Sequence, residues 1–251
     1  MVKGIERFAE HFAGFEEQYA VIGGAACDLL FDDVGLQFRG TKDIDMVVCV
    51  EVVELAFAER FGSFLDAGGY EAREHGDGKR QFYRFHKPKD DTYPYMLELF
   101  TRRQEVITLP ESAVVTRIVA EDDAASLSAI LLDDDYYAAI AAARRVVSGV
   151  SIIDESLLIP FKARAFLDLS TRAAAGEKID SKTIKKHRND IVRLSQLLVA
   201  DVAIDFGETI RNDMRRFLKT IEEREDVDTK SLGLKAPIQE VLARLRLAYG
   251  I

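Results

Sequence analysis

One short strand constrains this chain more than any other feature of its sequence. Residues 43–50 read Asp-Ile-Asp-Met-Val-Val-Cys-Val, a run that is apolar and mostly β-branched after Asp45, as in a buried central strand. Side chains alternate across a strand, so Asp43 and Asp45 point to one face, ~7 Å apart, while Ile44 points to the other. Two neighbouring carboxylates repel each other, and a bound cation would relieve that repulsion. Taken alone, the pair fits a metal site and a solvated strand end equally well.

A pair of glycines precedes this strand. The apolar residues 19–22 predict a second short strand, and Gly23-Gly24 open a helical stretch that runs to Leu30. Glycine leaves the backbone N–H groups unobstructed, and the start of a helix carries partial positive charge. This turn therefore suits the phosphates of a nucleotide. Because nucleotide phosphates bind together with divalent metal ions, the turn also favours the metal-site interpretation of Asp43 and Asp45.

A third carboxylate lies in a later strand. Residues 95–100 read Tyr-Met-Leu-Glu-Leu-Phe, in which Leu97 and Leu99 alternate with Glu98, so that Glu98 faces away from the core. If this strand neighbours the strand of Asp43 and Asp45, three carboxylates lie on one face of the sheet.

The order of the apolar patterns predicts the fold class. Helices and strands alternate in the first half of the chain, and helical spacing dominates the second half, which indicates an α/β (α+β) protein with a mixed sheet over 1–153 and a helical domain over 154–251. Between them we expect an Ala-rich helix that reaches residue 147, after an acidic run, Asp133 to Asp135, interpreted as a solvated turn. Further strands are expected at 70–74, 81–85, 95–100, 114–119, 126–132 and 150–153, and further helices at 51–64, 161–175, 182–199, 207–225 and 236–248.

The charge distribution limits the classes of partner. The formal net charge is −9, which argues against a protein that coats nucleic acid non-specifically. Residues 151–251 hold 18 Lys and Arg against 16 Asp and Glu, a net of +2, which leaves 16 against 27, a net of −11, for residues 1–150. The second half can therefore present a basic surface, although ordinary solvated helix faces would give the same count.

Neither targeting nor cysteine chemistry is indicated. The sequence shows no secretory signal pattern and no apolar run near the ~20 residues of a membrane span, so we expect a cytoplasmic protein. The two cysteines, Cys27 and Cys49, lie in apolar segments outside any zinc-binding pattern, and are interpreted as small core residues.

In combination these motifs resemble a known family. The segments 22–26 (Ile-Gly-Gly-Ala-Ala), 39–45 (Arg-Gly-Thr-Lys-Asp-Ile-Asp), 158–165 (Leu-Ile-Pro-Phe-Lys-Ala-Arg-Ala) and 186–190 (Lys-His-Arg-Asn-Asp) are similar to motifs of the AbiEii/AbiGii-type toxin nucleotidyltransferases. These belong to the DNA polymerase β-like nucleotidyltransferase superfamily. The resemblance covers about residues 20 to 195 and implies the polymerase β-like fold for the first domain.

The resemblance also implies a mechanism. Two Mg²⁺ ions would be held by Asp43, Asp45 and Glu98, and a nucleotide would move from an NTP to an acceptor hydroxyl. Gly23, Gly24, Arg39, Lys162 and Asp190 would bind the nucleotide. From the residues alone, Lys162 reads as an exposed helix lysine, and Asp190 as the surface ion-pair partner of Lys186 four residues earlier.

The acceptor is left open by the sequence. RNA, such as a tRNA, is the first expectation, with the chain acting as a toxin beside a cognate antitoxin. Cations that could guide RNA lie at Arg164, Arg172, Lys182, Lys185, Lys186, Arg188 and Arg193. The alternatives are transfer to a small molecule such as an antibiotic, transfer to a protein hydroxyl, and nucleotide binding without turnover.

Overall fold

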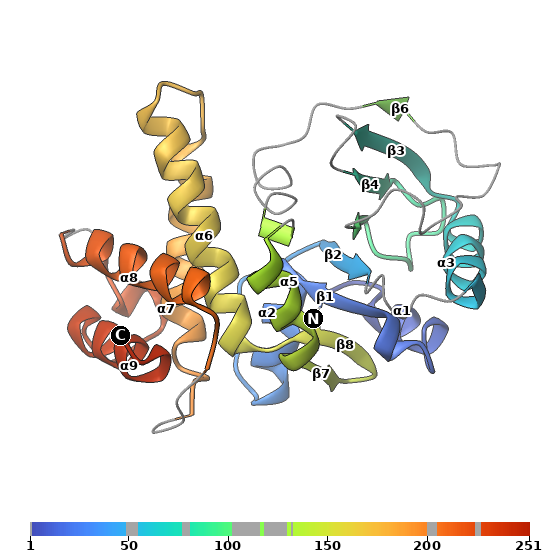
Figure 1. Cartoon of the computed structure of the whole chain (residues 1–251). Helices are drawn as coiled ribbons and strands as arrows, with labels where there is room; N and C mark the ends of the chain where they lie inside the picture. Colours follow the sequence, from blue (N-terminus) through green and yellow to red (C-terminus); the bar gives the residue numbers. More distant parts are fainter. Residues whose placement is uncertain are drawn as a thin grey trace. The chain divides into compact units, whose positions relative to one another are not determined.

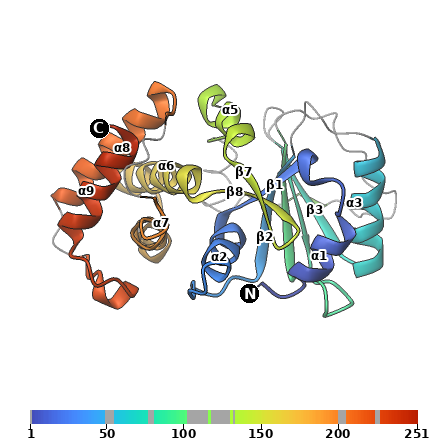
Figure 2. The ribbon, with the colours of Figure 1, turned by 90° about the horizontal axis from the view of Figure 1, so that it is seen from below.

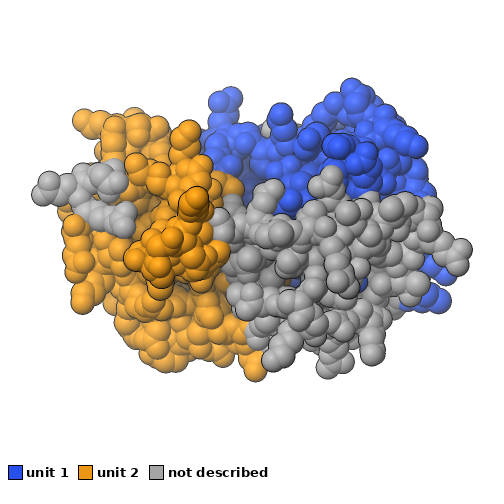
Figure 3. Space-filling view, turned by 90° about the horizontal axis from the view of Figure 1, so that it is seen from above, with its two compact units in different colours: residues 1–120, 144–154 blue, residues 121–143, 155–251 orange. Residues whose placement is uncertain are grey.

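The computed structural model describes residues 2–48, 55–76, 81–101, 116–117, 130–131, 133–199, 205–223 and 227–251. The chain forms two compact units, shown in blue and orange in Figure 3. Unit 1 comprises residues 1–120 and 144–154, and unit 2 comprises residues 121–143 and 155–251. The chain therefore passes from one unit to the other three times.

Unit 1 is built on one mixed sheet (Figure 1). Within the described ranges, the sheet has eight strands in the order β6-β3-β4-β5-β2-β1-β8-β7. In chain order the strands are β1 (Tyr19–Ile22), β2 (Asp43–Val48), β3 (Glu71–Gly76), β4 (Gln81–His86), β5 (Met96–Thr101), β6 (Thr116–Arg117), β7 (Arg144–Val147) and β8 (Val150–Ile153). The central strand β2 pairs antiparallel with β1 and parallel with β5, and β5 pairs antiparallel with β4.

Helices cover both faces of this sheet. In Figure 2, α1 (Ile5–His11) and α3 (Leu55–Gly68) lie on one side of the strands and α2 (Gly23–Asp33) lies on the other. The face under α1 and α3 is packed with aromatic rings: Phe8 of α1 and its C-cap residue Phe12 contact Phe64 of α3 and Tyr19 of β1 at centroid distances of 5.4 to 5.9 Å. Their spacing of four residues places Phe8 and Phe12 on the same side of α1, which is why this short helix docks there.

Unit 2 is helical. It contains α5 (Asp134–Ala142), α6 (Glu155–Ala174), α7 (Ser181–Leu194), α8 (Glu208–Glu222) and α9 (Ile238–Tyr249), with short 3₁₀ turn η2 (Lys230–Leu232); unit 1 has a similar turn, η1 (Glu16–Gln18). The long helix α6 packs against both α7 and α8, and Phe166 of α6 meets Phe217 of α8 edge to face at 5.4 Å. Pro160 lies inside α6 rather than at its start. None of the helices in the described ranges has the length and apolar character that a bilayer span requires.

The fold class expected from the sequence, an α/β chain with a mixed sheet and a helical C-terminal part, is confirmed. Three local expectations are wrong. The helix expected to reach residue 147 ends at Ala142, and residues 144–147 form strand β7, which turns into β8 through Ser148 and Gly149 at φ 51° and 76°. Two consecutive positive φ angles close a two-residue hairpin, and this local geometry overrides the helical pattern before it. Ile130 and Leu131, expected in a strand, are helical, and residues 126–129 lie outside the described residues. Of the predicted strand 114–119, only residues 116–117 lie within the described residues, and they form β6.

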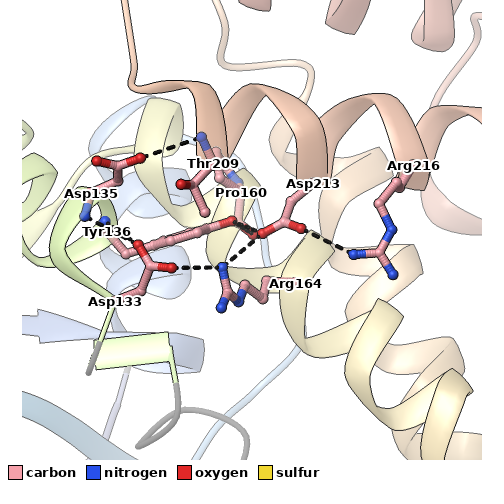
Figure 4. Close-up of polar contacts among 8 residues, drawn as sticks. All are labelled: Asp133, Asp135, Tyr136, Pro160, Arg164, Thr209, Asp213 and Arg216. Carbon is pink, nitrogen blue, oxygen red and sulfur yellow. Dashed lines mark hydrogen bonds and ion pairs between the residues drawn. The ribbon is translucent and has the colours of Figure 1, made fainter.

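The third wrong expectation concerns the acidic run, which is not a solvated turn. Asp133 caps α5 by accepting hydrogen bonds from the N–H groups of Asp135 and Tyr136. Asp135 accepts a hydrogen bond of 3.3 Å from the N–H of Thr209, at the start of α8, where the preceding Gly207 has no side chain to act as a cap. Figure 4 shows both contacts. These contacts fix α5 to other helices of unit 2. Residues 121–143 therefore belong to unit 2 although they precede β7 and β8 of unit 1, whereas the sequence patterns predicted one boundary after residue 153.

Candidate active site

The strand register places the three predicted carboxylates on one face of the sheet. In the parallel pair of β2 and β5, Asp45 lies opposite Glu98 and Asp43 lies opposite Met96. Since side chains alternate, Asp43, Asp45 and Glu98 share a face. Asp43 and Asp45 are half-buried, and Glu98 is buried.

The other face explains why these carboxylates point where they do. Ile44 and Leu97 are opposite each other in the same strand pair, and Leu97 lies opposite Phe85 of β4. Phe85 in turn contacts Phe61 of α3 at 5.6 Å. The apolar residues of β2 and β5 thus join the core under α1 and α3, which leaves the acidic residues on the face that carries α2.

Gly23 brings the start of α2 directly against Asp45. Gly23 has φ +67°, and Ile22 before it lies opposite Asp45 in the β1–β2 pair. A Cβ atom at Gly23 would lie 2.1 Å from Oδ2 of Asp45, so a side chain at this position would displace the carboxylate. A Cβ atom at Gly24 would lie 3.0 Å from Oγ1 of Thr41. Both glycines therefore stand where the backbone approaches other groups closely.

The beginning of α2 is suited to an anion. Its N-cap residue is Ile22, whose side chain has no oxygen to accept from the first N–H groups of the helix. These groups and the helix dipole favour negative charge at this end. Asp45 supplies one carboxylate there, and a phosphate bridged to it by a cation would satisfy the same preference.

Glu98 has a cationic partner that sequence reasoning missed. Nε of Arg84 on β4 donates to Oε1 of Glu98 at 2.7 Å, and an Nη atom of the same guanidinium lies 2.5 Å from the same oxygen. Both side chains are about nine-tenths buried. The signal was present in the sequence, because Arg84 alternates with the apolar Tyr83 and Phe85 as Glu98 alternates with two leucines. Over the described ranges, no three His, Cys, Asp or Glu side chains come close enough together to hold one metal ion.

Lys162 and Asp190 are brought together, but inside unit 2. Nζ of Lys162 on α6 lies 2.9 Å from Oδ2 of Asp190 on α7, and the two side chains are 6% and 0% exposed. Arg193 approaches the other oxygen of Asp190 at 3.8 Å. Lys162 is thus not an exposed helix lysine, and the main partner of Asp190 is not Lys186 at the surface. The pair joins α6 to α7.

Arg39 lies in the segment that precedes β2. Its guanidinium stands over the ring of Phe38 at 5.4 Å, and the side chain is half-buried. Phe38 itself packs against Phe31 of α2. This segment is therefore anchored to α2, and Thr41 within it contacts Gly24.

Most of the cations expected to guide RNA already have partners. Arg164 contacts Asp133 and Asp213, both at 3.1 Å (Figure 4). Arg188 is buried and donates to Asn189. Arg172 and Arg193 also lie in ion pairs, with Asp168 and Glu177 and with Asp190 respectively. The first turns of α7 carry Lys182 and Lys185, which are exposed, and Lys186, which is half-buried.

The chain is similar to several solved structures, whereas no protein-family model and no curated protein sequence matches it. An antigenic nucleotidyltransferase-like protein from Paracoccidioides brasiliensis aligns over 94% of both chains at 16% identity with a TM-score of 0.45. The antibiotic-resistance factor ANT(2'')-Ia aligns over 88% of this chain and 95% of its own, at 14% identity with a TM-score of 0.40. MenT4, a nucleotidyltransferase toxin from Mycobacterium tuberculosis, aligns over 93% of this chain and 74% of its own, at 17% identity with a TM-score of 0.29. All three TM-scores are below 0.5, so the function of this chain is inferred from its own residues.

Proposed function

We propose that this chain is a Mg²⁺-dependent nucleotidyltransferase that moves a nucleoside monophosphate from an NTP to an acceptor hydroxyl. The observation that carries the proposal is the contact between Gly23 and Asp45. It joins a carboxylate of the Asp-x-Asp strand to a glycine-lined helix start that has no side-chain cap, and both of these elements favour a metal-bound triphosphate at one place.

The residues fit a magnesium site. Mg²⁺ is usually bound through one or two carboxylates together with waters and substrate phosphates, rather than in a cage made only of protein ligands. Asp43 and Asp45, half-buried on one face, supply that number of carboxylates. When bound, Mg²⁺ would activate the acceptor oxygen and neutralise charge on the triphosphate.

The remaining residues would bind and orient the substrates. The N–H groups that follow Gly23 and Gly24 would bind the triphosphate, and Arg39, which precedes the strand, would supply a cation near it. Glu98 would face the acceptor hydroxyl. Lys162 and Asp190 support this proposal less than their motif suggests, because their charges are already used in a buried pair; we assign them the positioning of α6 and α7.

For the acceptor we propose RNA, such as a tRNA, which would make the chain a toxin with a cognate antitoxin. Lys182, Lys185 and Lys186, all on the first turns of α7, support this choice, because three cations within five residues suit a phosphate backbone. Transfer to an antibiotic or a protein hydroxyl would use the same chemistry in unit 1 and would not depend on these lysines.

The test is a transfer assay with the purified chain, Mg²⁺, each of the four labelled NTPs and total RNA. Asp45→Asn should lower the rate at least about a hundredfold while the melting temperature stays close to that of the wild type, since the change removes a charge without removing volume. Asp32→Asn, an exposed position on α2, is the matched control and should keep full activity. An Asp45→Asn variant with more than about a tenth of the wild-type rate would contradict the proposal.

The acceptor is tested separately. Replacing Lys182, Lys185 and Lys186 by Glu should weaken labelling of RNA and make the remaining labelling less sensitive to salt, with NTP binding unchanged. Labelling of an antibiotic or a protein by the wild type, without labelling of RNA, would support the alternatives instead.

A further inference from the structure

Three charged residues lie side by side across three neighbouring strands of unit 1. Asp45 of β2 lies opposite Glu98 of β5, and Glu98 lies opposite Arg84 of β4. Neighbouring strands are about 4.8 Å apart, so this row places Glu98 between a carboxylate and a guanidinium on the face that carries the candidate site.

Glu98 is bound to the guanidinium side of this row. Both close contacts from Arg84 are made to one oxygen, Oε1, at 2.7 and 2.5 Å. Arginine does not lose its proton in proteins, and at this degree of burial the attraction between the two charges is only weakly screened. Arg84 is thus a permanent cation built into the acidic face.

We propose that Arg84 is a positioning residue of the transferase reaction, which holds Glu98 in place beside the Asp43–Asp45 pair and sets the net charge of the site. This inference rests on the proposed function. Counted over these four groups alone, the three carboxylates and one guanidinium carry two net negative charges, which a bound divalent ion would offset. Without Arg84 the same face would carry three, and Glu98 would be drawn toward the ion.

Removal of the Arg84 charge is expected to change metal affinity and the rate of transfer in opposite directions. Loss of Arg84 should strengthen binding of a divalent ion, because one more negative charge faces it, and should at the same time slow transfer, because Glu98 is no longer held in its position. A purely structural role predicts loss of both. A role in binding triphosphate predicts a raised KM for NTP with kcat unchanged, and the burial of Arg84 against Glu98 opposes that role.

The experiment measures Mn²⁺ binding by calorimetry without nucleotide, together with kcat and KM for NTP in Mg²⁺. Arg84→Met should tighten Mn²⁺ binding by about tenfold and lower kcat by at least about tenfold. Arg84→Lys, which keeps the charge, should leave Mn²⁺ affinity near the wild-type value. Glu98→Gln added to Arg84→Met should reverse the tightening, since the charge that Arg84 balanced is then absent.

A matched control separates this effect from the loss of any arginine. Arg60→Met, at an exposed position on α3 and therefore on the opposite side of the sheet, should change neither Mn²⁺ affinity nor kcat. If Arg84→Met does not fold, Arg84→Gln retains a hydrogen-bond donor to Glu98 and should give the same tightening. Unchanged or weaker Mn²⁺ binding in a folded, uncharged Arg84 variant overturns the inference.

The outcomes also distinguish this inference from the proposed function. If Arg84→Met tightens Mn²⁺ binding but the wild type transfers no nucleotide, the proposed transferase function is rejected, and the effect of Arg84 on the charge of the site is supported. Transfer by the wild type with Mn²⁺ affinity unaffected by Arg84→Met would reject the role of Arg84 and keep the transferase. A wild-type chain that does not bind Mn²⁺ would reject both.

Discussion

The phenol of Tyr249 donates a hydrogen bond of 2.7 Å to the carbonyl oxygen of Ser156, four residues before Pro160. In a regular helix that carbonyl accepts from the N–H of residue 160, but proline has none. Tyr249, at the end of α9 and almost fully buried, supplies a donor in its place. An interior proline, which would otherwise cost α6 about 3 kcal/mol, is thereby partly compensated by a different helix.

Tyr249→Phe is therefore expected to lower the free energy of unfolding by about 1 kcal/mol, the value of one buried hydrogen bond. Urea unfolding of the full chain measures the change. In a Pro160→Ala background the helix regains its own N–H donor, and the same substitution should then cost clearly less. An equal cost in both backgrounds would show that Tyr249 acts by packing alone.

Gly23→Ala should abolish binding of divalent ions, because the new methyl group displaces the carboxylate of Asp45. Gly35 is a matched control: its φ of +70° is nearly that of Gly23, and a Cβ atom there meets no atom within 4 Å. Gly35→Ala should thus carry only the backbone strain of about 1–2 kcal/mol and keep Mn²⁺ affinity. Equal Mn²⁺ affinity in the two variants would exclude the contact between Gly23 and Asp45 as a feature of the site.

Asp190→Ala should destabilise the chain by about 3–5 kcal/mol, because it leaves the ammonium group of Lys162 buried without the carboxylate. Adding Lys162→Met removes the buried charge and should recover much of that loss. Thermal and urea unfolding measure both variants. If Asp190→Ala alone has wild-type stability but binds NTP more weakly, the result would instead support the nucleotide-binding role that the motif suggested.

Stability should fall at high pH through Tyr136. Burial, together with the nearby carboxylate of Asp213, raises the pKa of the Tyr136 phenol well above its ordinary value. Its contribution to stability is then complete below the pKa of an unfolded tyrosine, about 10, and is lost as the pH rises above it, since only the unfolded chain ionises readily. Tyr136→Phe should show a smaller loss of stability between pH 9 and 11, roughly the range around that pKa. An identical pH dependence in the two proteins would contradict this assignment.

Local patterns were enough to predict most of the fold and half of the candidate site. Apolar alternation identified β2 and β5, and the glycines marked the start of α2, because these features depend on residues close in sequence. The pairing of Glu98 with Arg84 depends on the register between β4 and β5, and the pairing of Lys162 with Asp190 depends on how α6 packs on α7. Such contacts between distant segments are set by tertiary packing, which spacing alone does not encode.

The position of α5 has a consequence for how such a chain can evolve. Asp133 and Asp135 precede β7 and β8 in the sequence, yet they bind Arg164 and the start of α8, which follow those strands. No single recombination breakpoint can separate unit 1 from unit 2, because each unit is made of two stretches of sequence that alternate with those of the other. Exchange of the helical part between related genes would require three coordinated crossovers, one at each junction between the units, so the two parts are expected to be inherited together.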